Sequence, residues 1–385
     1  MNIDKPLPLL GGISPAEFMR DYWQKKPLLI RAALPGFGPL LDRAELFDLA
    51  AQDDVESRLV VRQPDGADGQ PAWSLRRGPF GRRALPALRQ PGWTILVQGV
   101  DLYDQRVHDL MAQFRFVPDA RLDDLMISYA SDTGGVGPHF DNYDVFLLQA
   151  HGRRRWRIGR QKNKRLLDDV PLKILANFAP EQDFVLEPGD MLYLPPQWAH
   201  DGIAEGECMT YSIGFKSPDQ PELASALLQR LADQAGDALE PTIYKDADQP
   251  AVAAPARLPE GLVAFARASL EAVLADPDAL RRALGEYLSE PKANVWFDTQ
   301  DAQTADALPT GDLHLDRRSR MLYDDRHIYI NGEGYRAGGR DARLLQRLSD
   351  ERMLPAKQAA QLSNAARELV QQWNDSGWIF VVPAD

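Results

Sequence analysis

Cysteine is almost absent from the sequence, with Cys208 as the single example among 385 residues. One thiol cannot form an internal disulfide, and it cannot build a metal site of the thiolate type. A metal bound by this chain would therefore need histidine and carboxylate ligands, and the sequence offers six histidines. We expect Cys208 itself to be a small buried side chain.

Long apolar runs are also missing. No stretch approaches the roughly 18 to 20 residues that cross a bilayer. The N-terminal MNIDKPLPLLGG lacks the basic start and the long apolar segment of a secretory signal. These absences predict a cytoplasmic protein with no membrane association.

Basic charge is in deficit, with 44 Lys and Arg against 56 Asp and Glu, a net charge of −12 and a pI near 5.1. Such a balance argues against tight generic binding to nucleic acid. It favours a basic polypeptide as the partner.

The first region, residues 1–216, mixes helices with many short strands. Ser14-Pro15-Ala16-Glu17 has the pattern of a helix N-terminus and predicts a helix to about Gln24, while PLLIRAAL predicts a strand. From about residue 95 to 215 the sequence runs through WTILVQGV, LMISYAS, DVFLLQA, RRRWRIG, DFVLEPGD, MLYLP and MTYSIGF. Short strands at this spacing indicate an antiparallel sandwich or barrel.

Two further regions come after it. Residues 217–285 carry apolar residues three and four apart, which predicts helices that form either a dimerisation unit or a packed bundle. Residues 286–385 combine short strands with helices in an order that resembles a winged helix. This last region has 12 basic and 16 acidic residues, a net charge of −4, so we expect no direct DNA binding.

One polar segment precedes a strand in the first region: GVGPHFDNYD, residues 135–144. Side chains two apart on a strand face the same way, so His139 and Asp141 can reach one ion, with Phe140 pointing outward. A third candidate, His200, lies 59 residues after Asp141, in EPGDMLYLPPQWAHDG. Two histidines and one carboxylate are the ligand set of non-haem Fe(II) oxygenases, which leaves positions for a cosubstrate and oxygen.

The same three-residue pattern occurs again in His314-Leu315-Asp316 and serves as an internal control. Its one following histidine, His327, stands eleven residues past Asp316 in a segment that reads as a polar hairpin. A single His-x-Asp is therefore weak on its own. The distant His200 and the surrounding strands make the first pattern the candidate metal site. The glycines of GVG are not a phosphate loop, because no Gly-Lys-Ser/Thr comes after them.

An inward-facing arginine is predicted in HGRRRWRIG. Arg154 alternates with Trp156 and Ile158, which should face inward, whereas Arg153, Arg155 and Arg157 should face solvent. A buried arginine needs an anion, and its fork suits a carboxylate such as the far end of an α-keto acid. On the strand DDLMIS, Asp124, Met126 and Ser128 form another alternating set. Ser128 can join Arg154 at that carboxylate, and Asp124 would be an acceptor at the cavity mouth.

These segments resemble the Jumonji-C 2-oxoglutarate oxygenases, and within them the bacterial ribosomal oxygenases. The likeness is carried by GVGPHFDNYDVFLLQAHGRRRWRIG, EPGDMLYLPPQWAHDG and YWQKKPLLIRAA, and by the order of the three regions. It implies an α+β chain: a double-stranded β-helix (jelly-roll, cupin-like) catalytic domain over residues 1–216 with an N-terminal extension, a helical dimerisation segment over 217–285, and a winged-helix-like domain over 286–385.

The resemblance also implies roles for single residues. His139, Asp141 and His200 would be the Fe(II) ligands and the catalytic centre. Arg154 and Ser128 would hold 2-oxoglutarate, with molecular oxygen as the second cosubstrate. Animal relatives generally use lysine as this anchor, so the arginine is typical of the bacterial branch.

Members of that branch hydroxylate an arginine at its β-carbon on a basic large-subunit ribosomal protein. A guanidinium needs an acceptor and flat walls. Asp124 is the expected charge partner, Met126 and Tyr143 the walls, and Ser212 a further polar contact. Two alternatives stay open. One is the same chemistry on histidine or methyl-lysine of another protein, and the other is a non-catalytic cupin-like binding module.

Overall fold

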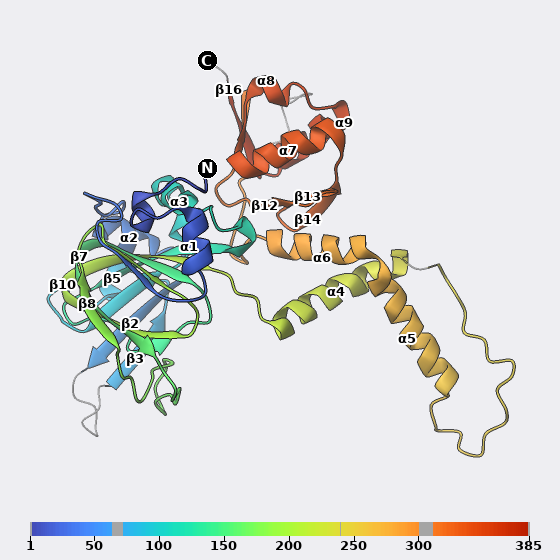
Figure 1. The fold of residues 1–385 in the computed structure, drawn as a ribbon, viewed down its shortest axis with the longest axis horizontal. Helices are drawn as coiled ribbons and strands as arrows, with labels where there is room; N and C mark the ends of the chain where they lie inside the picture. The colour runs from blue at the N-terminus through green and yellow to red at the C-terminus, as the bar shows by residue number, and fades with distance from the viewer. Residues whose placement is uncertain (1, 64–71, 239, 300–310, 384–385) are drawn as a thin grey trace. The chain divides into compact units, whose positions relative to one another are not determined.

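The computed structural model describes residues 2–63, 72–238, 240–299 and 311–383. The chain divides into two compact units, Met1–Ser217 and Pro218–Asp385, and each is described by itself (Figure 1). Within the described ranges, no helix is both long enough and apolar enough to cross a membrane.

The first unit is built around one antiparallel sheet of ten strands, in the order β1-β9-β7-β10-β5-β4-β2-β3, with β6 on β10 and β8 on β7. The strands are β1 (Leu28–Ile30), β2 (Ser57–Gln63), β3 (Ala72–Arg77), β4 (Trp93–Val97), β5 (Leu122–Ala130), β6 (His139–Phe140), β7 (Val145–Arg160), β8 (Gln182–Leu186), β9 (Met191–Leu194) and β10 (Trp198–Phe215). The helices are α1 (Pro15–Asp21), α2 (Arg43–Leu49) and α3 (Gln105–Ala112), with short 3-10 turns at Pro8–Leu10, Arg82–Ala84, Val100–Leu102 and Asp119–Arg121.

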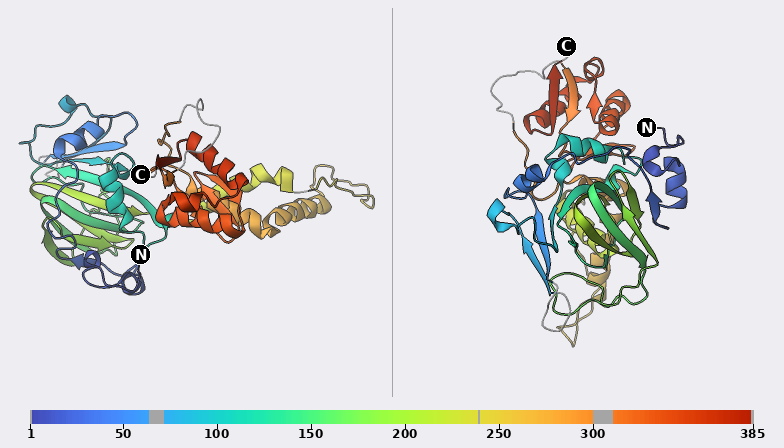
Figure 2. Two further views of the ribbon diagram at one scale, coloured as in Figure 1. Left: turned by 90° about the horizontal axis from the view of Figure 1, so that it is seen from above. Right: turned by 90° about the vertical axis from the view of Figure 1, so that its left-hand side faces the viewer.

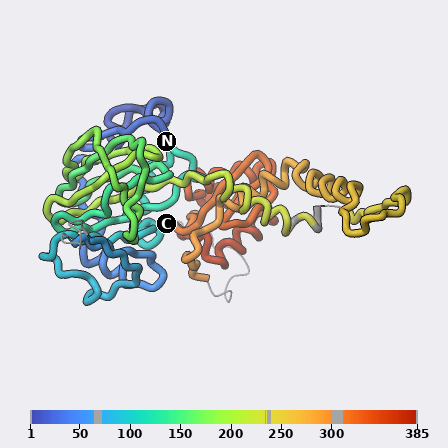
Figure 3. Tube along the Cα trace, turned by 90° about the horizontal axis from the view of Figure 1, so that it is seen from below, coloured from blue at the N-terminus to red at the C-terminus, as the bar shows by residue number. Residues whose placement is uncertain are grey.

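The two long strands, β7 and β10, shape this sheet. The first part of β7 pairs with β9 and its second part with β8, while β10 pairs with β6 near its start and with β5 near its end. Each long strand therefore belongs to two walls, and the sheet curls around an interior (Figure 2, right). This arrangement confirms the predicted jelly-roll. Figure 3 traces the same strands as green tubes.

Side-chain alternation gives the sheet two different faces. On one face, aromatic and aliphatic residues of β5, β7, β9 and β10 pack with α1 into the main core, which includes Phe18, Phe146, Tyr193 and Tyr211. The residues between them, such as Ser128 and Ser212, point to the other side and line a cavity. The N-terminal part thus buries the outside of the sheet and leaves the inside for a site.

The N-terminal helix starts as its sequence indicates. The Ser14 hydroxyl accepts a hydrogen bond from the Glu17 N–H at 3.1 Å, and Pro15 occupies the first helical position. The helix ends at Asp21, three residues short of the predicted Gln24, because the chain turns there to lay Trp23 into the core. Within PLLIRAAL, the strand covers Leu28–Ile30.

The second unit contains the helices α4 (Gln220–Ala238), α5 (Glu260–Ala275), α6 (Pro277–Ser289), α7 (Gly339–Glu351), α8 (Ala356–Ala359) and α9 (Asn364–Asp375). Its strands are β11 (Gly311–Leu315), β12 (Met321–Tyr323), β13 (His327–Ile330), β14 (Glu333–Arg336), β15 (Met353–Leu354) and β16 (Ile379–Pro383), in the two sheets β15-β11-β16 and β12-β13-β14. A core that includes Leu345, Leu348, Val370 and Trp373 joins α7 and α9 to these sheets.

Helix α6 belongs to both parts of the second unit. It contacts α4 and also lies against β12, β13 and β14. A side chain at Gly285 would collide with the Tyr329 ring, since a Cβ there would lie 2.4 Å from ring carbons. The helix runs on to Ser289, across the division at 285/286 that the sequence pattern suggested.

Candidate metal centre and the cavity around it

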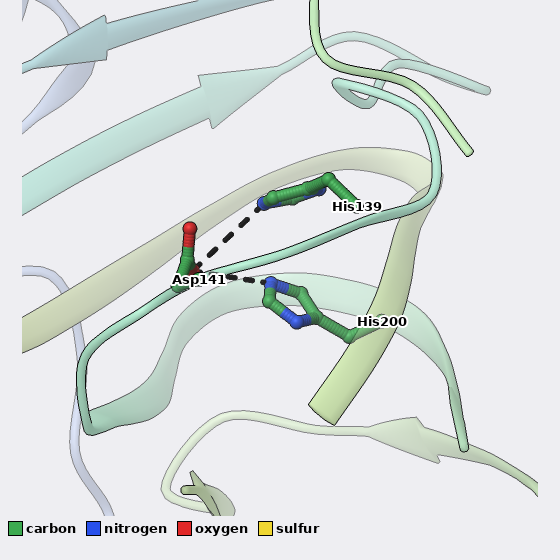
Figure 4. Close-up of side chains that lie close together, drawn as sticks. All are labelled: His139, Asp141 and His200. Carbon is green, nitrogen blue, oxygen red and sulfur yellow. Dashed lines mark ion pairs between the residues drawn. The ribbon is translucent and has the colours of Figure 1, made fainter. Parts of the chain in front are cut away.

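Three candidate ligands from two distant segments meet at one point. His139, Asp141 and His200 place their ligand atoms within 4.8 Å of one another (Figure 4). The Asp141 Oδ2 lies 4.0 Å from His139 Nε2 and 3.6 Å from His200 Nε2. Among the described residues, no other group of three histidine, cysteine or acidic side chains comes together in this way.

Strand pairing brings the two histidine rings close together, with their planes tilted by 59°. His139 of β6 is the register partner of His200, the third residue of β10, and their rings are 4.3 Å apart. The Nδ1 of His139 lies 2.9 Å from the Gly137 carbonyl, and the Nδ1 of His200 lies 3.0 Å from the Trp198 carbonyl. If each Nδ1 carries the proton, each Nε2 keeps its lone pair for a metal.

The strand that carries His139 is too short to include Asp141, although the sequence pattern placed both residues on one strand. β6 ends at Phe140, so Asp141 reaches the site from the following turn rather than from a strand. Phe140, which was expected to point outward, is among the residues that border the cavity, and the ammonium of the exposed Lys164 lies 5.0 Å from its ring centre.

The protonation of His200 favours metal binding. Burial, with the nearby His139 as a second cause, lowers the pKa of His200 to about 4. The imidazole is therefore neutral at pH 7 and needs to lose no proton to become a ligand.

The second His-x-Asp pattern has ordinary structural roles. His314 stacks on Phe380 with a centroid distance of 5.4 Å, and Asp316 binds the Arg318 guanidinium at 2.8 Å. His327 lies 3.3 Å from Asp324 instead of approaching either of them. The second His-x-Asp pattern therefore forms no metal site among the described residues, in contrast to His139 and Asp141.

A cavity of about 390 Å³ opens beside the three ligands. It is lined by all nine residues that the sequence singled out: His139, Asp141, His200, Arg154, Ser128, Asp124, Met126, Tyr143 and Ser212. Strand pairing puts Ser128 opposite Thr210 and Met126 opposite Ser212. The alternation on β5 thus placed its three candidates on the inner face.

Arg154 is buried in the wall of this cavity, with 4% of its surface exposed. Its Nη1 donates to the hydroxyls of Ser128 at 3.3 Å and Thr210 at 3.4 Å, and its Nη2 donates to the Gly202 carbonyl at 3.2 Å. The guanidinium also lies 5.1 Å from the Trp156 ring centre. These contacts use at most three of its five N–H donors, and Nε has no partner among the described residues.

The neighbouring arginines of β7 point away from the cavity, as alternation predicts. They are ion-paired across the strands rather than simply solvated: Arg153 with Glu205, Arg155 with Glu205 and Asp183, and Arg157 with Asp201. The contrast is informative, because no described carboxylate forms an ion pair with Arg154. A buried cation left without an anion is costly, and this arginine fits an incoming carboxylate.

At the other end of the cavity, Asp124 is held by the two residues that follow β4. Its Oδ2 accepts from the Gly99 N–H and from the Gln98 Nε2, both at 2.9 Å. The side-chain Oε1 of Gln98 in turn accepts a hydrogen bond from Arg58 Nη2 at 3.2 Å. Asp124 is 3% exposed, so its carboxylate lies deeper than the cavity mouth at which it was expected.

The remaining predicted residues occupy different depths. Ser212 is buried and Met126 half-buried, whereas Tyr143 is 43% exposed at the rim. Desolvation, with the nearby Asp141 carboxylate as a second cause, raises the pKa of the Tyr143 phenol, so it stays a neutral hydroxyl. The site thus has a cationic end at Arg154, an acidic end at the buried Asp124, and Tyr143 at its rim.

Sequence reasoning missed several polar residues around the cavity: Arg58, Gln98, Gln149 and Thr210. Gln98 could have been found, because it continues the alternating set Thr94, Leu96, Gln98 one residue past the end of β4. Thr210 stands two residues before Ser212 and shares its face. Gln149 gave less signal, since it ends an apolar run and does not reach the cavity.

The residues present fit iron(II) and 2-oxoglutarate. Two neutral imidazoles and one carboxylate form the donor set of a facial Fe(II) site. The unpaired buried guanidinium of Arg154 fits the far carboxylate of a keto acid bound beside the metal.

Comparisons with known proteins agree with this geometry. A model of the JmjC domain matches residues 109–223, and a model of the ROXA-like winged helix matches residues 272–380. The ribosomal protein uL16 3-hydroxylase of Escherichia coli is 34% identical over 325 residues, which cover 82% of this chain and 84% of that protein.

Solved structures extend the similarity to nearly the whole chain. The X-ray structure of E. coli ycfD matches with a TM-score of 0.82 at 31% identity, over 95% of this chain and 98% of that one. A structure of the E. coli ribosomal oxygenase YcfD in complex with cobalt and 2-oxoglutarate matches with a TM-score of 0.78 at 31% identity, over 95% and 97% of the two chains.

The jelly-roll and its two-histidine, one-carboxylate centre define a JmjC-domain 2-oxoglutarate oxygenase. The similarity over four fifths of the sequence is more specific, and the chain belongs to the ribosomal oxygenases within that class. Both the resemblance and the α+β fold with a C-terminal winged helix are confirmed.

Proposed function

We propose that the protein is an Fe(II)- and 2-oxoglutarate-dependent hydroxylase that acts on an arginine side chain, at the β-carbon, of a basic large-subunit ribosomal protein. One observation carries the proposal: a two-histidine, one-carboxylate centre and a buried, unpaired arginine line the same cavity. The name of the E. coli relative, a ribosomal protein uL16 3-hydroxylase, supports the substrate class.

Each residue then has a role. His139, Asp141 and His200 hold iron, and Arg154 with Ser128 binds the far carboxylate of 2-oxoglutarate. Iron and 2-oxoglutarate, when bound, supply with oxygen the oxidising power that inserts a hydroxyl group into a C–H bond. The protein's own contribution is to hold the target carbon beside the metal and to exclude water.

The substrate guanidinium would bind at the end of the cavity opposite Arg154. Asp124 provides the charge partner, Met126 and Tyr143 the flat walls, and Ser212 a polar contact. Because Asp124 is fixed by Gln98 and Gly99, it costs little further ordering to receive a cation. A charge-assisted pair at this depth would select arginine over neutral side chains.

The proposal extends to assembly and location. The catalytic domain would comprise residues 1–216, the helical dimerisation segment 217–285 and the winged-helix-like domain 286–385. Helix α5 exposes Val263, Leu270 and Leu274, and such an apolar face supports a homodimer. A ribosomal substrate is consistent with a cytoplasmic location.

Mass spectrometry of large-subunit ribosomal proteins tests the function directly. The proteins are incubated with the enzyme, Fe(II), 2-oxoglutarate and oxygen, and we expect one arginine to gain the mass of one oxygen atom. The His139→Ala variant serves as the inactive control. Hydroxylation of a histidine, or loss of a methyl group from lysine, would overturn the assignment of arginine as the target. If the protein bound ribosomal protein without iron and released no succinate, the proposal that it is an enzyme would be wrong.

A further inference from the structure

A hydrogen-bonded row crosses the cavity floor, from β5 over β10 to β7. Strand register places Ser128 opposite Thr210, and Thr210 opposite Gln149. The first two contact the Arg154 guanidinium, whereas Gln149 is fully buried behind them and does not line the cavity. We propose that Gln149 is a positioning residue that orients the Thr210 hydroxyl and thereby prepares Arg154 for the far carboxylate of the cosubstrate.

A bulge fixes the direction of the Gln149 amide. The pairing of β10 with β7 slips between Met209 and Thr210, so that β7 has one extra residue there. Gly152 comes next with a φ of +61°, and a Cβ at this position would lie 2.1 Å from the Glu207 carbonyl oxygen. This local backbone turns the carbonyls of His151 and Gly152 toward the Gln149 Nε2, at 2.8 and 3.3 Å.

The direction of each hydrogen bond along the row then follows from the direction of its neighbour. Carbonyl oxygens accept hydrogen bonds, so the Gln149 NH2 group must face them and its Oε1 must face Thr210. The Thr210 hydroxyl donates to that Oε1 at 3.0 Å, and its lone pairs are left for the Arg154 Nη1. The Ser128 hydroxyl is fixed in the same sense, since it donates to the Thr210 carbonyl at 3.4 Å.

The consequence concerns Arg154. With both hydroxyl protons directed elsewhere, its guanidinium meets acceptors on one side and is held without a carboxylate of the protein. Its Nε has no partner among the described residues, and Nη2 has one N–H beyond its bond to Gly202. If the Thr210 hydroxyl could rotate, its proton would point toward the Arg154 N–H group instead of offering it a lone pair. The preorganised carboxylate site would then be lost. This inference rests on the proposed role of Arg154 as the cosubstrate anchor.

The test measures ligand binding instead of turnover. Calorimetry on the Ni(II)-loaded full-length protein gives the Kd of 2-oxoglutarate, and of 2-oxobutyrate, a keto acid without the far carboxylate. Gln149→Met keeps the length of the side chain and removes the acceptor for Thr210. We expect it to raise the Kd of 2-oxoglutarate about tenfold, and to leave that of 2-oxobutyrate within about twofold.

A double-mutant cycle shows whether Gln149 acts through Thr210. Thr210→Val should weaken 2-oxoglutarate binding as Gln149→Met does, and the double variant should be no weaker than the worse single one. Thr210→Ser keeps the hydroxyl and should bind nearly as the wild type does. Additive effects in the cycle would overturn the proposal, and so would an equal loss of both keto acids. If Gln149→Met does not fold, the role of the Thr210 hydroxyl is tested with Thr210→Val and Thr210→Ser, by measuring the Kd of 2-oxoglutarate and of 2-oxobutyrate for each.

Two controls separate this inference from the function on which it rests. Arg154→Met should abolish the preference for 2-oxoglutarate over 2-oxobutyrate, and an unchanged preference would refute the anchor itself. If Arg154→Met loses that preference while Gln149→Met retains it, then Gln149 has no positioning role and the anchor stands. Gln105→Met alters an exposed glutamine of α3 whose side chain donates to Asp109, and this matched glutamine variant should leave 2-oxoglutarate binding intact.

Discussion

At the residue scale, Asp141 stands out because it provides the one carboxylate of the proposed iron site and comes from a turn. Its 3.6 and 4.0 Å approaches to the two histidines leave room for an ion between the three side chains. Asp141→Ala should reduce turnover by more than the roughly 10- to 100-fold typical of residues that only support a ligand. Iron content after dialysis, measured by atomic absorption, should fall in parallel.

The matched control is Asp316→Ala, in the second His-x-Asp pattern. Asp316 binds Arg318 and contributes to no metal cluster among the described residues, so iron content and turnover should stay at the wild-type level. Equal iron loss in both variants would show that the measurement reports damage to the fold and not the loss of a ligand.

Asp124 and Gln98 belong together at the residue scale as well. Asp124→Asn removes the charge that would hold the substrate guanidinium, and we expect the KM for the ribosomal protein to rise roughly tenfold or more. Release of succinate from 2-oxoglutarate in the absence of protein substrate should persist, because Arg154 is untouched. Gln98→Leu should shift the same KM in the same direction, and by less, since Gly99 still donates to Asp124. An unchanged KM in Asp124→Asn would place the substrate elsewhere.

At the element scale, the bulge between β7 and β10 allows a sharp comparison of two glycines. Gly152 and Gly206 both have a positive φ, +61° and +77°, but a Cβ at Gly206 meets nothing within 4 Å. Gly206→Ala should therefore lower the free energy of unfolding by the backbone strain alone, about 1 to 2 kcal/mol. Gly152→Ala adds a clash with the Glu207 carbonyl and should cost clearly more, as urea denaturation can show. Similar losses of unfolding free energy in both variants would mean that the backbone around Gly152 relaxes to relieve the clash.

The same strands show what a sequence can and cannot predict. Alternation placed Ser128 and Arg154 on the inner face correctly, because long paired strands impose a period of two. It gave no prediction for Gln149. The role of that glutamine depends on the slip between Met209 and Thr210, which is a property of pairing between strands and leaves no local pattern. Burial of Asp124 was underestimated for a related reason, since it depends on the turn at Gly99.

At the scale of the whole molecule, the helical segment carries exposed apolar side chains on α5. Val263, Leu270 and Leu274 are 42, 69 and 51% exposed, and their spacing of seven and four residues puts them on one face of α5. Apolar side chains aligned on an exposed helix face are typical of a surface that pairs with another chain. We expect a second copy of this chain to cover that face.

A charge introduced into the α5 face tests that assembly. Leu270→Asp should raise the Kd of self-association at least about tenfold, because each dimer loses two buried leucines and gains two like charges. Sedimentation velocity over a range of concentrations gives the constant. Leu88→Asp alters a leucine of the first unit that is 45% exposed, and it should leave the Kd unchanged. Because the ligands, Arg154 and Asp124 all come from residues 1–217, hydroxylation per chain by a monomeric Leu270→Asp should approach that of the wild type when substrate is saturating. A large loss of that activity would instead show that the active site depends on the assembled dimer.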